Sequence, residues 1–152
     1  MEKSPNAMLA VLSAGFGCGV LDITVALVVY GYLGAKPMRL LQGIASGLLG
    51  PKAFDGGLAT ALLGLLCHFF IAFGAATVYF VASRGIHILV EQAVVFGAVY
   101  GVAVYFFMNR VVLPLSAAAK RPFSMKLMII GVIIHIFCVG LPISLSVRRF
   151  SK

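Results

Sequence analysis

Charged residues are scarce in this chain of 152 residues, and acidic residues are the scarcest. Asp and Glu number 4 against 12 Lys and Arg, and charged residues make up 11% of the chain, whereas soluble proteins average about 25%. Hydrophobic residues make up 62%. This composition indicates an integral membrane protein. The basic excess fits loops that rest against anionic lipid headgroups, so we expect no nucleic-acid partner.

Sequence motifs for known chemistry are also missing. The three cysteines, at positions 18, 67 and 138, lie in apolar stretches and form no CxxC or CxxCH pair. They therefore predict neither a redox pair nor haem attachment through thioether bonds. The chain has no HExxH, no phosphate-binding glycine loop and no spacing that pairs a nucleophile with a base. We therefore do not expect an enzyme.

Four apolar runs are long enough to cross a bilayer, which takes roughly 20 helical residues. They cover residues 8–33, 58–82, 92–115 and 127–147. A shorter amphipathic stretch, 38–49, lies between Pro37 and Pro51, and we expect it to be an interfacial or re-entrant helix. The sequence thus predicts an all-α fold, a polytopic membrane protein. A single bundle of four transmembrane helices should occupy residues 1–152, with both termini on one side.

Small residues mark the faces on which these helices should pack. Gly-xxx-Gly patterns, which let helices approach closely, occur in the first and third runs. In the second and fourth runs a glycine stands four residues before a histidine. This weak internal sequence similarity would fit a tandem repeat of two helix pairs. The glycines that we expect at helix contacts are Gly15, Gly19, Gly64, Gly97, Gly101 and Gly131.

Each predicted span carries one polar group on the same side as its small residues. These groups are Asp22, His68, Tyr105 and His135, with Asn109 one turn beyond Tyr105. At 1.5 Å per residue, the two histidines lie roughly 14–15 Å from the same membrane face, and the other groups lie at a similar depth. We therefore expect a polar layer near the bilayer midplane.

Several functions could use such a layer, because ionisable groups at this depth are rare and mark function. One is proton-linked transport of an ion or small molecule, with Asp22 alternately protonated or paired with a cation. Another is a structural or accessory bundle in which the polar groups only hydrogen-bond to each other. We expect no cofactor, but haem between His68 and His135, or a metal ion on these histidines, remains an alternative.

Four segments resemble a family of small bacterial inner-membrane proteins, distantly similar to the YagU type. They are Val20-Leu-Asp22-Ile, the stretch from Leu41 to Gly50 with Ala53-Phe54, the stretch from His68 to Ala72, and Met108-Asn109 followed by Pro114-Leu-Ser. The resemblance covers nearly the whole chain. It implies the bacterial inner membrane and four spans, and it supplies no activity.

The four helices and the single carboxylate in the first are also similar to small multidrug resistance transporters. The long first loop, the two histidines and the lack of Trp depart from that pattern.

The expected partner is the lipid bilayer with its anionic headgroups, and self-association into a homo-oligomer stays open. Loops that carry more Lys and Arg tend to stay in the cytoplasm, and by this rule a small excess of basic residues places both termini outside. The basic residues on the side of the termini are Lys3, Arg84, Arg148, Arg149 and Lys152, and those on the other side are Lys36, Arg39, Lys52, Arg110, Lys120, Arg121 and Lys126.

Overall fold

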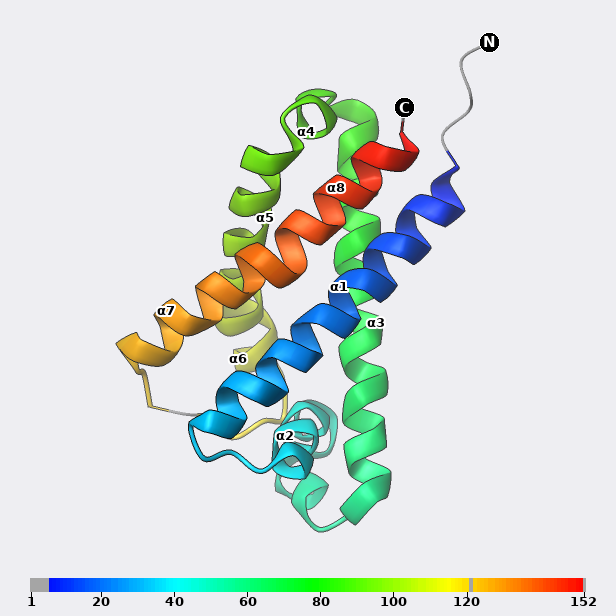
Figure 1. Ribbon diagram of the computed structural model, residues 1–152. Coiled ribbons are helices and arrows are strands. Elements are labelled where there is room, and N and C mark those ends of the chain that lie inside the picture. The colour runs from blue at the N-terminus through cyan, green and yellow to red at the C-terminus, as the bar shows by residue number, and fades with distance from the viewer. Residues whose placement is uncertain (1–5, 121, 152) are drawn as a thin grey trace.

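Four long helical segments form the protein in a computed structural model that describes residues 6–120 and 122–151 (Figure 1). Lys3, Arg121 and Lys152, which entered the charge count above, lie outside the described residues. The segments are α1 (Ala7–Tyr32), α3 (Gly57–Gly85), α5 (Ala93–Phe107) with its continuation to Leu115, and α7 (Met125–Ile134) with its continuation to Phe150. Each is long and apolar enough to cross a membrane. The described residues contain no strand, so the prediction of an all-helical fold is confirmed, with four helices of the length and composition that a membrane span requires.

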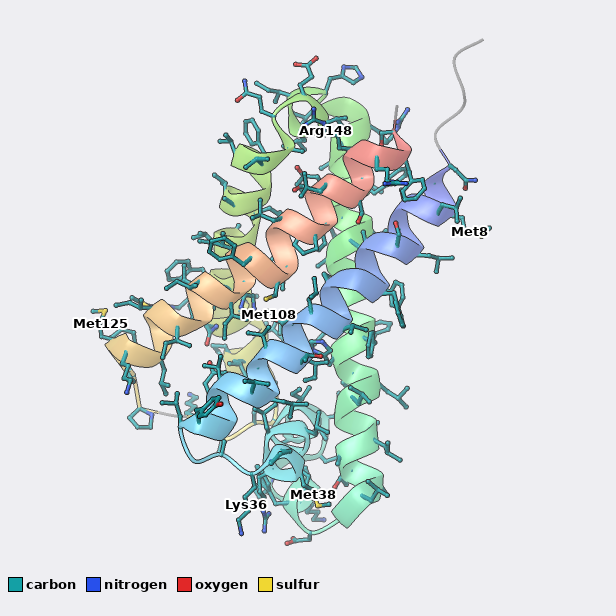
Figure 2. All side chains as sticks on the ribbon, viewed as in Figure 1. Met8, Lys36, Met38, Met108, Met125 and Arg148 are labelled. Atoms are coloured by element: carbon teal, nitrogen blue, oxygen red, sulfur yellow. The ribbon has the colours of Figure 1, made fainter. Side chains whose placement is uncertain are left out.

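Shorter elements connect the spans or lie within them. Helix α2 (Pro37–Leu49) and the 3₁₀ turn η1 (Gly50–Phe54) join α1 to α3, and α4 (Ile88–Glu91) joins α3 to α5. The beginning of α1 and the end of α8 (Leu141–Phe150) both lie at the α4 end of the molecule, opposite α2 (Figure 1). Lys36 and Arg148 mark these two ends (Figure 2).

The third and fourth spans each contain a π-helical turn shortly before a proline. The turn η2 (Met108–Val112) precedes Pro114 in α6 (Leu113–Leu115), and η3 (His135–Gly140) precedes Pro142 in α8 (Leu141–Phe150). A proline within a helix lacks the N–H and presses on the carbonyl four residues earlier, so a wider turn there relieves the clash. The fourth span therefore continues as a helix from Pro142 to Phe150, whereas the third ends at Leu115, directly after Pro114.

The spatial order of the spans differs from their order along the chain. Helix α1 packs against α3 on one side and against η3 and α8 on the other, and α5 packs on η3 and α8. The fourth span therefore lies between the first and the third (Figure 1). A core cluster of Ala14, Ala76, Tyr79 and Ile143 fills the space between these helices.

Helix α2 is fixed to the beginning of α3 by polar contacts. The Gln42 amide, which is buried, donates to the Gly57 carbonyl at 3.0 Å, and Arg39 donates to the Phe54 carbonyl at 3.0 Å. Helix α3 also presents Gly64, where a Cβ atom would collide with the Leu41 carbonyl oxygen of α2. The amphipathic segment therefore forms a helix that packs against the first part of α3.

The six glycines selected from the sequence face two kinds of neighbour. A Cβ on Gly97 or Gly101 would meet the backbone of span four, at Gly140 and at His135, and Gly64 faces the α2 backbone. The remaining three face aromatic rings instead: Gly15 faces Phe73, Gly19 faces Phe69 and Gly131 faces Tyr105. Close backbone approach between spans therefore occurs between the third and fourth. Gly140, which the sequence analysis did not select, takes part in it.

Candidate functional site

Asp22 and His68 lie side by side between α1 and α3. The Asp22 Oδ2 atom is 3.9 Å from His68 Nδ1, which makes the two residues an ion pair whenever the imidazole is protonated. The side chains are 16% and 13% exposed, respectively, so most of each is enclosed by the bundle. Periodicity along the two helices had predicted that both side chains point inward, and the structure places them together.

The Gly19 carbonyl determines which ring nitrogen of His68 carries a hydrogen. His68 Nε2 lies 2.9 Å from this oxygen, and a carbonyl can only accept a hydrogen bond. Nε2 therefore carries a hydrogen and donates it. The second nitrogen, Nδ1, faces the Asp22 carboxylate.

The other carboxylate oxygen of Asp22 has an unusual environment. Asp22 Oδ1 is buried and has no hydrogen-bond partner in the described part of the chain. Buried polar atoms are nearly always paired, so Asp22 Oδ1 is an exception among the described residues.

His135 and Tyr105 form a second, separate pair between η3 and α5. Their rings meet edge to face with centroids 5.3 Å apart. The Nδ1 atom of His135 lies 2.9 Å from the Gly131 carbonyl on its own helix. The single polar layer expected from the sequence is therefore two pairs, one on each side of the contact between α1 and span four.

Asn109 joins neither pair. It is exposed on η2, and its amide donates to the Tyr105 carbonyl of the same span at 2.9 Å. Asn109 therefore contacts the second pair only through the main-chain carbonyl of Tyr105.

The histidines are not arranged around a common ligand. Both ring nitrogens of His68 face groups on α1, whereas His135 contacts its own helix and α5. Within residues 6–120 and 122–151, no three His, Cys, Asp or Glu side chains are grouped so that they could hold a metal ion. Bis-histidine haem ligation would require His68 to give up one of its present contacts.

Two tyrosines that the sequence analysis did not select, the buried Tyr79 and the half-buried Tyr100, connect α3 to α4 and α5. Tyr79 donates to the Leu89 carbonyl of α4 at 2.9 Å, and Tyr100 donates to the Ala75 carbonyl of α3 at 2.7 Å. Their rings meet with centroids 4.9 Å apart. They form part of an apolar groove of about 160 Å³ between α3 and α5, lined by Val78, Tyr79, Ala82, Leu89, Phe96, Val99, Tyr100 and Ala103. Their position within apolar runs is the only sequence signal, because a tyrosine there needs an acceptor for its hydroxyl group.

Comparison of the chain with protein-family models, with curated proteins and with solved structures gave no match in any of the three.

Proposed function

We propose that this is a multi-pass membrane protein in which Asp22 and His68 form the proton-binding site of a proton-linked transporter for an ion or small molecule. The observation that carries the proposal is the buried, unpaired Oδ1 atom of Asp22, next to a histidine whose Nε2 is occupied by the Gly19 carbonyl. This arrangement leaves one proton position, between the carboxylate and Nδ1, that can be filled or empty.

The energy of burial supports an exchangeable site over a purely structural one. A carboxylate at the centre of a membrane helix costs about 2.5–3.5 kcal/mol on insertion scales. A group retained only for hydrogen bonding would be expected to satisfy both oxygens, since each unpaired buried atom lowers stability by about 1–3 kcal/mol. The buried Oδ1 atom of Asp22 has no hydrogen-bond partner in the described residues, and Oδ2 lies 3.9 Å from His68 Nδ1.

The proposal includes the location of the protein, the bacterial inner membrane, and its partner, a bilayer with anionic headgroups. The resemblance in the Asp22 and His68 segments supports the bacterial inner membrane. The charged ends of the molecule, marked by Lys36 and Arg148, suit a bilayer with anionic headgroups (Figure 2). The apolar and polar faces of α2 favour a position in the interface at one end of the bundle.

A structural role is the second candidate, and one contact favours it. The bond from His68 to the Gly19 carbonyl holds α3 against α1 whether or not Asp22 is charged. If this is the whole role of the pair, an amide at position 22 should serve as well as a carboxylate.

The deciding experiment measures proton binding by the purified protein in detergent. Wild type should take up and release protons between pH 5 and 9 in a step that Asp22→Asn removes while the helical content stays the same. Asp55→Asn, a change of the same kind at an exposed position before α3, serves as the control. His68→Gln should shift the step, and His87→Gln, which changes an exposed histidine near α4, should not. The absence of any step that depends on Asp22 would exclude transport and leave the structural role.

A further inference from the structure

We infer that the outer face of α8 carries a binding site for the phosphate group of an anionic phospholipid. The site is an open cavity of about 460 Å³, and the described residues that line it are Leu145, Ser146, Arg148 and Arg149. This volume falls in the range of about 300–1,000 Å³ that small-molecule sites have. The inference rests on the membrane location proposed above and is independent of the proton site at Asp22.

The cavity residues project from a helix that is fixed on its other side. The inward face of α8 carries Ile143, Ser144 and Val147, each with none of its surface exposed. At about 100° per residue, the four cavity residues lie on the opposite side of the same turns. The inward face packs against α1 and α5. A ligand of the cavity therefore meets a backbone that is already ordered, which lowers the entropy cost of binding.

Arg148 and Arg149 bring two positive charges to the cavity, and no described side chain neutralises them. Neither guanidinium group has a hydrogen bond or a salt bridge to another described residue, and the Ser146 hydroxyl has no such hydrogen bond either. A guanidinium group can donate two parallel hydrogen bonds to two oxygens of one phosphate, and a serine hydroxyl can donate a further one. The charge and the donors therefore select a phosphate compound with a net negative charge.

A place in the last turn of a helix would by itself favour basic residues, because a cation there interacts with the helix dipole. Arg148 and Arg149 lie in the last turn of α8, and Arg84 lies in the last turn of α3. Arg84, however, lies over the Phe80 ring, with its guanidinium carbon 6.0 Å from the ring centroid. The two arginines of α8 differ because they share a cavity with an unpaired hydroxyl group. The helix dipole does not explain that arrangement.

The order of the cavity residues along α8 favours a lipid over a soluble phosphate compound. Arg148 lies at the α4 end of the molecule (Figure 2). Leu145, which is 44% exposed, lies about 4.5 Å deeper along the helix at 1.5 Å per residue. A phospholipid in the proposed bilayer has the same order, with its phosphate at the membrane surface and its acyl chains below. Leu145 would then contact an acyl chain, which a soluble phosphate compound lacks.

Native mass spectrometry of the protein in a neutral detergent tests the inference, because it counts the lipid molecules that stay bound. Wild type should retain one molecule of dioleoylphosphatidylglycerol per chain. It should bind dioleoylphosphatidylcholine about tenfold more weakly, which corresponds to about 1.4 kcal/mol, because the choline group brings a positive charge towards the two arginines. Equal retention of the two lipids would overturn the inference.

Matched arginine variants locate the site. Arg148→Gln and Arg149→Gln should each weaken the binding of dioleoylphosphatidylglycerol about tenfold, or about 1.4 kcal/mol. Arg148→Lys should weaken it as well, since lysine keeps the charge but loses the paired hydrogen bonds. Arg84→Gln removes the same charge at the same end of the molecule and should leave binding unchanged. An equal loss in Arg84→Gln, or no loss in the α8 variants, would refute a site on α8.

Two further probes of the wild-type protein separate a lipid from a soluble phosphate compound. Inorganic phosphate and glycerophosphoglycerol, which is the headgroup without its acyl chains, should not displace the bound lipid. Displacement by either would assign the cavity to a soluble compound and overturn the lipid. Asp22→Asn should bind the lipid as wild type does. If no lipid is retained while the Asp22-dependent step in the pH titration remains, the lipid site is wrong and the proposed proton site stands.

Discussion

Adding a methyl group at Gly64 tests the contact that holds α2 on the bundle. The new Cβ would collide with the Leu41 carbonyl oxygen and lie 2.8 Å from the Leu41 carbonyl carbon. Helix α2 cannot simply move away, because Gln42 and Arg39 fix it to Gly57 and Phe54. Overpacking of this kind lowers stability by about 1–3 kcal/mol.

Gly74→Ala provides the control on the same helix, because a Cβ there meets nothing within 4 Å. Both changes replace glycine by alanine inside α3, which favours the helix by about 0.8–1.0 kcal/mol. That gain is common to the two variants. Their difference in the free energy of unfolding should therefore equal the clash alone, about 1–3 kcal/mol, with Gly64→Ala the less stable.

The assay is unfolding by sodium dodecyl sulfate in mixed micelles, followed by far-UV circular dichroism. Hydrogen exchange then locates the effect, and the amides of α2 should exchange faster in Gly64→Ala than in Gly74→Ala. Equal stability of the two variants, with unchanged exchange in α2, would show that α2 does not pack on Gly64.

Three further predictions follow from the span arrangement, the two histidines, and Tyr79 and Tyr100. Reporter fusions should alternate between the two sides of the membrane when placed after Gly50, Gly85 and Lys120 and at the C-terminus; the same side for the first two would refute four spans. The purified protein should show no Soret band, because His68 and His135 contact different helices; a band lost in both His68→Ala and His135→Ala would establish haem. Tyr100→Phe should lower stability by about 0.6–1.7 kcal/mol through loss of the bond to the Ala75 carbonyl, whereas the same change at Tyr32, which is 89% exposed, should have no effect on unfolding.

Hydropathy and helical periodicity predicted the four spans and the inward direction of Asp22 and His68. Both properties are local, since they depend on about 20 residues of one helix. The division of the polar layer into two pairs could not be predicted in this way. His68 and His135 have similar sequence surroundings, yet His68 contacts α1 and His135 contacts α5, because span four lies between α1 and α5. Periodicity predicts which face of a helix is buried, but it does not predict which other helix packs against that face.

The role of Gly140 could not be predicted from the sequence of its own helix either. It forms no Gly-xxx-Gly pattern within its own helix, so only its contact with Gly97 and Gly101 across the interface reveals its role. A proline at position 142, inside the fourth apolar run, predicts a kink. The structure accommodates it with the π turn η3, after which the helix continues as α8.

The position of span four also constrains how the protein can be assembled. In the multi-pass membrane protein that we propose, the helix that separates the first span from the third is the last of the four to leave the ribosome, so α5 enters the bilayer before the surface on which it packs exists. Until residues 125–150 follow, the glycine face of α5 at Gly97 and Gly101 has only lipid beside it. A chain that stops after α6 should therefore be inserted but unassembled, and a membrane protease should degrade it faster than the full-length protein.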